Sequence, residues 1–187
     1  MTNENAREAL IQAAIALLGS PRPPAMPLRE VAEAAGVTTG AIQHYFGNRQ
    51  GLLVAAVDRQ TERLVERLTS VADTHPAGHP DRLFMLLMQL LPLDEERTRE
   101  TRLLTAFERS ASEDPTMTAE FAHRYRRLID MVRGELPGGD ADAALLLWVT
   151  YGAGADLLLG VATPESAVSG IHRMLGMLGV EESGSTG

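Results

Sequence analysis

The sequence predicts an all-α fold of about nine helices. Along most of its 187 residues, apolar side chains recur every three or four positions, which is the period of an amphipathic helix. No segment alternates apolar and polar residues for long enough to predict a sheet. We expect a three-helix N-terminal domain with a helix-turn-helix at about residues 1–50, a helical-bundle regulatory and dimerisation domain at 51–180, and a disordered tail at 181–187.

The first expected helix covers residues 5–18 and places Ile11, Ile15 and Leu18 on one face. It ends at Gly19 and the proline-rich loop SPRPPAMP. We interpret this loop as a stiff connector, with a PxxP recognition motif as the alternative.

The segment from Pro27 to Phe46 predicts two short helices around a tight turn. Gly36 follows the first helix and tolerates a positive φ, and Val37 can return to the core. Thr38 is a competent N-cap for the second helix. The inward-facing positions are Leu28, Val31, Ala32, Ala35, Ile42 and Phe46. This arrangement presents a helix to a DNA groove, and a helical hairpin inside an ordinary bundle is the alternative.

The outward face of the second helix is small, polar and uncharged, which suits the reading of base edges. Gln43 can pair with adenine through two hydrogen bonds, Thr39 can contact a base through its hydroxyl or methyl group, and Gly40 permits close approach. Sequence readout is therefore expected to lie on this face.

Affinity for DNA is expected to come from the helix that follows these two short helices, which Asn48 caps and Arg49 begins. Its first N–H groups and the guanidinium form a phosphate site. Tyr45 has two possible roles: its ring can pack in support of the second short helix, or its hydroxyl can contact a phosphate. The expected DNA contacts are Arg29, Thr38, Thr39, Gly40, Gln43, His44, Tyr45 and Arg49.

Residues 44–53, HYFGNRQGLL, resemble the TetR family of one-component transcriptional regulators. In that family an aromatic residue is followed three positions later by a basic residue and then by a leucine pair. Arg49 stands where the family usually has Lys, Pro27 where it usually has Ser or Thr, and Gln43 where Tyr is most frequent. The resemblance covers roughly the first 60 residues and implies a dimer with a small molecule bound among the later helices.

We call the N-terminal helix-turn-helix domain, at about residues 1–50, the head. After the helix-turn-helix the sequence predicts six helices: about 48–73, 81–91, 95–111, 115–135, 140–161, and one from Pro164 to Leu178. Asp114 is the expected N-cap of the helix at 115–135, and Thr163 is the expected N-cap of the helix that starts at Pro164. His75 and His79 have the four-residue spacing of a helical metal pair, but Pro76 and Gly78 between them argue against a helix. No metal site is therefore expected.

Residues 144–162 are apolar on nearly every face and about long enough to cross a bilayer. Asp156, three glycines and the lack of a basic flank favour a buried helix instead. Together with the apolar face of the last helix, this segment is expected to pair with a second copy as a four-helix bundle. The expected dimer contacts are Leu157, Val168, Ile171 and Leu175.

Aromatic and methionine side chains in the second domain suit a pocket for a largely apolar effector. The candidate lining residues are Phe84, Met88, Phe107, Tyr125, Trp148 and Tyr151. A role in the core alone is the alternative for each of them.

The net charge is −8, yet residues 1–60 hold five arginines and five acidic residues. A neutral head implies modest non-specific affinity and reliance on dimerisation.

The sequence has no cysteine, no secretory signal, no Gly-rich phosphate loop after a strand and no nucleophile-base pair, so we expect a cytoplasmic protein that is no enzyme and has no cofactor. The expected function is a repressor that binds a palindromic operator as a homodimer and is released by an effector. An α-helical small-molecule binding or interaction protein without DNA-binding activity is the alternative.

Overall fold

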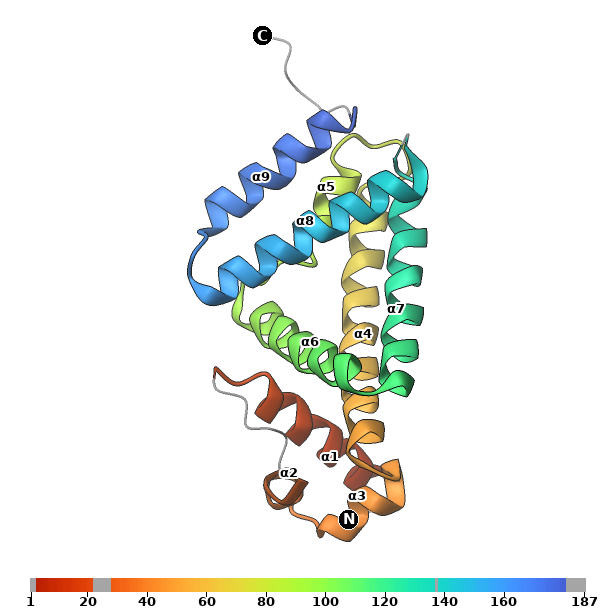
Figure 1. Cartoon of the computed structure of the whole chain (residues 1–187), viewed down its shortest axis with the longest axis vertical. Coiled ribbons are helices and arrows are strands. Elements are labelled where there is room, and N and C mark those ends of the chain that lie inside the picture. The colour runs from red at the N-terminus through yellow and green to blue at the C-terminus, as the bar shows by residue number, and fades with distance from the viewer. Residues whose placement is uncertain (1–2, 22–27, 137, 181–187) are drawn as a thin grey trace. The chain divides into compact units, whose positions relative to one another are not determined.

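The computed structural model describes residues 3–21, 28–136 and 138–180, and every described element is a helix (Figure 1). Most of the proline-rich loop, Pro27 and the C-terminal tail lie outside these residues. The helices are α1 (Asn3–Leu18), α2 (Leu28–Ala34), α3 (Thr39–Phe46), α4 (Arg49–Thr74), α5 (Arg82–Met88), α6 (Glu95–Glu113), α7 (Pro115–Arg133), α8 (Gly139–Leu159) and α9 (Pro164–Met177). The all-α prediction is confirmed for the described chain.

Side-chain caps fix several helix starts where the sequence predicts them. The Asn48 Oδ1 accepts the Gly51 N–H at 2.8 Å at the start of α4, and the Asp114 Oδ1 accepts the Thr116 N–H at 2.8 Å at the start of α7. Thr163 and Ser166 exchange side-chain and backbone bonds in a capping box at the start of α9. Each cap satisfies N–H groups that have no partner within the helix.

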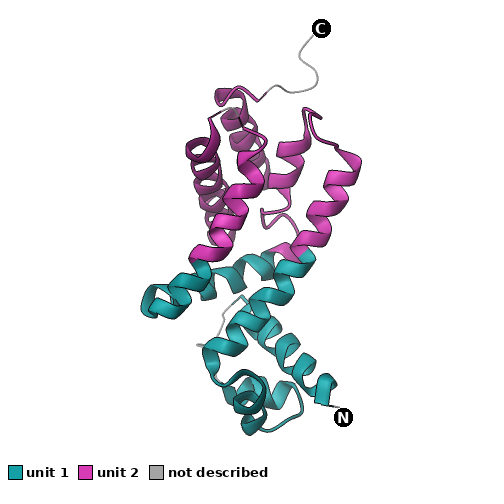
Figure 2. Ribbon diagram, turned by 90° about the vertical axis from the view of Figure 1, so that its right-hand side faces the viewer, with its two compact units in different colours: residues 1–63, 98–121 teal, residues 64–97, 122–187 magenta. Residues whose placement is uncertain are grey.

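The chain divides into two compact units, shown in different colours in Figure 2. Unit 1 comprises residues 1–63 and 98–121, so most of α6 joins the head that the sequence places at about 1–50. Its core combines buried residues from α1, α2, α3, α4 and α6 with Met117 of α7. The helix-turn-helix therefore rests on a hydrophobic core that includes segments distant in the sequence.

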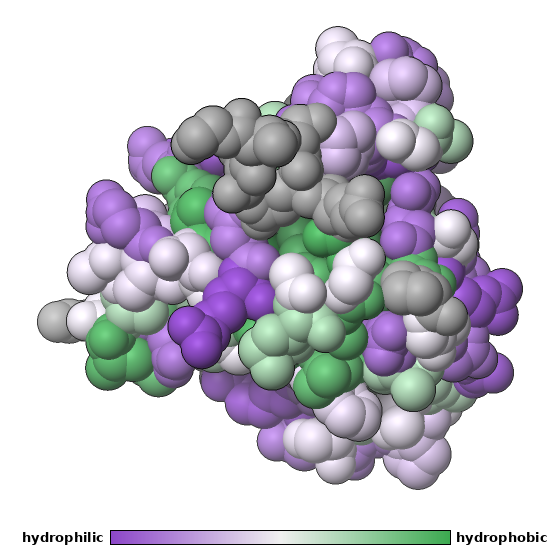
Figure 3. Space-filling model, turned by 90° about the horizontal axis from the view of Figure 1, so that it is seen from above, coloured by the Kyte–Doolittle hydropathy of each residue, from purple (hydrophilic) through white to green (hydrophobic). Residues whose placement is uncertain are grey.

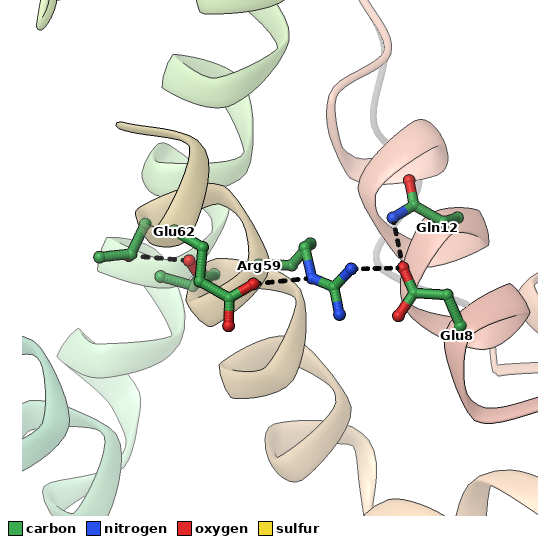
Figure 4. Close-up of polar contacts among 6 residues, drawn as sticks. Glu8, Gln12, Arg59 and Glu62 are labelled. Carbon is green, nitrogen blue, oxygen red and sulfur yellow. Dashed lines mark hydrogen bonds and ion pairs between the residues drawn. The ribbon is translucent and has the colours of Figure 1, made fainter. Parts of the chain in front are cut away.

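A polar network joins α1 to α4 inside unit 1 (Figure 4). The Glu8 Oε1 accepts hydrogen bonds from the Gln12 Nε2 and from the Arg59 Nη1, both at 2.8 Å. The Arg59 Nε also pairs with the Glu62 Oε2 at 3.0 Å. Because Glu8 and Arg59 are both half-buried, this pair orients α1 on α4 more effectively than a fully exposed ion pair would.

Gln60 interrupts the apolar face of α4 and is only 8% exposed. Its Oε1 is buried without a hydrogen-bond partner among the described residues, which costs the folded state free energy. Gln60→Leu should therefore raise the free energy of unfolding by about 1 kcal/mol. Urea unfolding followed by circular dichroism measures this change. Gln12→Leu is the matched control and should give no gain, because it removes the hydrogen bond to Glu8.

Unit 2 comprises residues 64–97 and 122–187. Its cores draw on the end of α4 and on α5, α7, α8 and α9. α8 buries Ala143, Leu146, Leu147 and Thr150, and the Thr150 hydroxyl donates to the Leu146 carbonyl oxygen at 2.8 Å. α8 is also the one helix of the described chain that is long and apolar enough to cross a membrane, a property shared by core helices of this kind.

Candidate DNA-binding surface

The turn between α2 and α3 has the backbone that the sequence predicts. Gly36 adopts φ +68°, the left-handed region in which glycine is free of strain. The Val37 N–H donates to the Ala32 carbonyl oxygen at 3.0 Å, and Val37 packs against the core of unit 1. These contacts close α2 and direct the chain into α3.

α3 is held by one buried residue and exposes a polar face. Ile42 is 1% exposed and lies in the core of unit 1. The exposed residues on and next to this helix are Thr38, Thr39, Gly40, Gln43 and His44. Thr38 has the extended backbone of an N-cap, although its side chain makes no capping bond. The exposed residues can hydrogen-bond to base edges without first breaking a contact within the protein.

Tyr45 is half-buried, and its hydroxyl donates to the Asn3 Oδ1 at the start of α1. Its ring also meets the rings of His44 and Phe46 edge-on, at centroid distances of 4.9 and 6.2 Å. This residue therefore fastens α3 to α1. These contacts fit the packing role, and a contact from the hydroxyl to a phosphate stays a prediction.

The junction between α3 and α4 depends on two glycines that sequence reasoning did not single out. Gly47 ends α3 with φ +72°, and its N–H donates to the Gln43 carbonyl oxygen at 3.1 Å. Gly51 lies so close to the Phe46 carbonyl group that a Cβ would overlap its oxygen and lie 3.1 Å from its carbon. The close approach places Arg49 in the first turn of α4, directly after α3.

The arginines of this surface differ in their partners. The Arg29 Nε pairs with the Glu33 Oε1 at 2.9 Å, and the Arg29 side chain is 85% exposed. Arg49 is half-buried and pairs with no carboxylate among the described residues, where its Nε is also without a hydrogen-bond partner. Arg49 is thus the better placed of the two for an anion, because no carboxylate compensates its charge.

The model of the family "Bacterial regulatory proteins, tetR family" matches residues 10–56, the segment that contains α2, α3 and their turn. A transcriptional regulator from Rhodococcus sp. Rha1 has a similar solved structure, with a TM-score of 0.82, 28% identity, and coverage of 92% of this chain and 95% of that one. The chain belongs to the TetR family. Members are transcriptional regulators with a DNA-binding helix-turn-helix and are not enzymes.

Two curated HTH-type transcriptional regulators are similar in sequence. The regulator PksA of Bacillus subtilis is 31% identical over 81 residues, which are 42% of this chain and 38% of that protein, so the match spans less than half of its length. The regulator BetI of Rhizobium meliloti is 29% identical over 141 residues, which cover 73% of this chain and 68% of that protein.

The structure gathers several of the expected pocket residues in the core of unit 2. The Phe84 ring stacks on the His172 ring at a centroid distance of 3.8 Å, and the Tyr125 and Tyr151 rings lie 6.3 Å apart. Burial raises the pKa of the Tyr125 phenol, and a hydrogen bond with the Trp148 side chain acts in the opposite direction. Met88 is buried in the same core.

Phe107 is not part of this group. It is fully buried in the core of unit 1, where its ring lies 6.0 Å from that of Phe121. The expectation that it lines a pocket with Phe84 and Tyr125 is therefore corrected. The period of α6 marks Phe107 as inward-facing, but α6 packs into the TetR head.

Two of the four expected dimer contacts need correction, and the other two stay predictions. Ile171 and Leu175 are 0% and 2% exposed within the single chain, because α9 packs its apolar face on α8 and α5. Leu157 and Val168 are half-buried. The large apolar side chains that unit 2 leaves exposed among its described residues are Val65, Leu145, Trp148, Leu159, Val161 and Met177. Figure 3 shows apolar side chains at the surface among hydrophilic ones on one face of the molecule.

The two loop histidines lie side by side in the loop before α5. The His75 and His79 rings lie 4.8 Å apart, but the His79 Nδ1 accepts the Asp81 N–H at 3.2 Å. No group of three potential ligands occurs in the ranges that the structure describes.

Proposed function

We propose that this TetR-family protein is a cytoplasmic, effector-responsive repressor that binds a palindromic operator as a homodimer. The observation that carries this proposal is the exposed, uncharged face of α3, followed directly by Arg49 without a carboxylate partner in the described chain. A groove-reading helix requires such a face, and a phosphate contact beside it fixes the register on the duplex.

In the proposed complex, Gln43 reads one base step, Thr39 and His44 contact neighbouring positions, and Gly40 lets α3 approach the base edges. Arg49 binds a backbone phosphate together with the first N–H groups of α4. Arg29 is a weaker contributor, because its ion pair with Glu33 must first be exchanged for a phosphate contact. Thr38 and Tyr45 support α3 from its two ends.

The exposed apolar residues of α8 and of the segment after it support the dimer. Leu145, Trp148 and Leu159 recur at helical spacing on α8, and Val161 follows them. Exposed apolar groups of this size mark an interaction surface in a soluble protein. A twofold pair of heads presents two copies of α3 about one DNA turn apart, which requires a palindromic operator.

The proposed effector is a small, largely apolar molecule bound in unit 2 near Phe84, Tyr125 and Tyr151. Aromatic rings that present an apolar body with a polar edge suit such a ligand. A ligand that prefers one spacing of the two heads shifts the protein away from the DNA-bound state, and its differential affinity sets the size of the shift.

Gln43→Ala and Arg49→Ala should weaken DNA binding in different ways. Gln43→Ala should cost about 1 to 3 kcal/mol and relax specificity at one base step, because a base-edge contact is lost. Arg49→Ala should weaken binding to all DNA sequences by a similar factor, because a phosphate contact carries no sequence information. Titrating a duplex selected by the wild-type protein and single-base variants of it measures both effects.

Arg126→Ala is the matched control for this experiment. Arg126 is an exposed arginine on α7 in unit 2, and its replacement should change neither affinity nor specificity. If the Gln43 and Arg49 variants show the same pattern across the single-base variants, the division between reading and anchoring is wrong.

The second candidate is an α-helical binding protein that has lost DNA binding. The observation in its favour is the charge: −8 overall, with no net positive charge in residues 1–60. Non-specific DNA affinity comes from arginine and lysine on phosphates, so a neutral head is a handicap. The two candidates differ in whether the protein shifts a duplex in a gel and in how that shift responds to salt.

A further inference from the structure

We propose that Arg7, on α1, is a phosphate-binding residue of the DNA interface. The inference rests on the proposed function and adds a cation that the helix-turn-helix itself does not contain.

The first turns of α1 lie against the C-terminal end of α3. Asn3 and Arg7 are four residues apart, so they share one face of α1. Asn3 accepts the hydrogen bond from the Tyr45 hydroxyl, and the Arg7 Cζ lies 5.4 Å from the centre of the Phe46 ring. Two successive turns of α1 thus contact two successive residues of α3.

The charge of Arg7 is not compensated by a carboxylate in the described part of the chain. Glu8, its sequence neighbour, is occupied by Arg59 and Gln12. Glu4, one turn earlier on α1, makes no ion pair with Arg7 within the described residues. Arg29 and Arg59 both pair with carboxylates. Arg7 is therefore, like Arg49, a cation of the head that can accept an external anion.

The Phe46 ring holds the Arg7 guanidinium beside α3 while leaving it exposed to solvent. Because Arg7 is exposed, the N–H groups of its guanidinium stay available, and their geometry matches the oxygen atoms of a phosphate. Phe46 is the last residue of α3, and Arg49 begins the next helix three positions later. Arg7 and Arg49 thus approach the same end of α3 from two different helices.

The chemistry that this pair of arginines recognises is the phosphodiester backbone at the edge of the groove that α3 enters. Such a contact fixes register and raises affinity for all sequences alike. It also partly offsets the neutral charge of the head, because each phosphate that a cation neutralises releases counterions.

Four variants of the full-length protein test the role of Arg7. Arg7→Met keeps an apolar stem on Phe46 and removes the charge, Arg7→Gln removes the charge with a polar side chain, and Arg7→Lys keeps the charge. Arg126→Met removes a charge from α7 as the control. The probes are a duplex recovered by the wild-type protein from a random pool and a scrambled duplex of the same composition. Affinity is measured over a salt series, and thermal unfolding is followed in parallel.

Arg7→Met and Arg7→Gln should each weaken binding to both duplexes by about three- to tenfold at low salt. The slope of log affinity against log salt should become shallower by about 0.9 per head. Arg7→Lys should retain most of the wild-type slope, and Arg126→Met should retain all of it. A folded neutral variant with the wild-type slope would overturn the proposal, and so would an Arg7→Lys protein that behaves like Arg7→Met.

The same series separates failure of this inference from failure of the proposed function. If the wild-type protein binds neither duplex in a salt-dependent way, the DNA-binding function itself is wrong. If the wild-type slope is steep and Arg49→Ala reduces it while Arg7→Met does not, only the role of Arg7 is wrong.

Discussion

Replacing Phe107 with alanine should lower the free energy of unfolding by about 3 to 5 kcal/mol. The side chain is fully buried, and it shares a core with Leu10, Leu52 and Met117. Truncation removes its transfer free energy and leaves a cavity that rigid helices fill only in part. The measurement is urea unfolding at one fixed protein concentration, because the proposed dimerisation would make the apparent stability depend on concentration.

Val65→Ala is the control for the Phe107 experiment. Val65 is exposed on α4, so its truncation should change the free energy of unfolding by less than about 0.5 kcal/mol. A Phe107→Ala protein that loses less than about 1 kcal/mol would contradict a core role. Such a result would return Phe107 to the candidate pocket residues.

Gly51→Ala should destabilise unit 1 by about 1 to 3 kcal/mol and abolish DNA binding. The added Cβ overlaps the Phe46 carbonyl oxygen, which is backbone and cannot rotate away as a side chain would. The end of α3 must therefore move away from α4. This movement displaces Gln43 relative to Arg49, so the protein loses both stability and its contact geometry.

Gly40→Ala is the matched control, because it also adds one methyl group to a helical glycine of the head. Its Cβ would meet nothing closer than the Thr38 Oγ1 at 3.7 Å, an ordinary contact. Alanine is the better helix former, so this variant should gain about 0.5 to 1 kcal/mol while losing DNA affinity through the blocked approach to the bases. Thermal unfolding and a gel shift on both variants separate the two effects. Equal stability of the two variants would refute the close approach at Gly51.

The starts of several helices were predictable from the sequence because local chemistry determines them, whereas some ends differ, such as that of α5, which ends at Met88 and not at residue 91. Asn48, Asp114 and Thr163 each cap the helix that follows, and each cap uses only residues two or three positions away. Gly36 adopts the positive φ that its place after an amphipathic segment indicates. Cap and turn signals that involve only neighbouring residues can be recognised in a single sequence.

Contacts between distant segments were not predictable in the same way. Phe107 and Ile171 both lie on inward faces, and the helical period says nothing about which neighbour each face meets. Arg7 and Phe46 are far apart in the sequence, and no local pattern relates a cation on α1 to a ring at the end of α3. The close approach at Gly51 likewise depends on how α3 turns into α4.

The most direct test of the account is the salt dependence of wild-type binding to the DNA upstream of its own coding sequence. If Arg7 and Arg49 of two heads each neutralise one phosphate, log affinity should fall with log salt with a slope of about −3 to −4. A steep slope of this size, together with a discrete complex at low salt, is the result that the account predicts. Flat, salt-insensitive behaviour at micromolar protein would contradict it and favour a helical binding protein without DNA-binding activity.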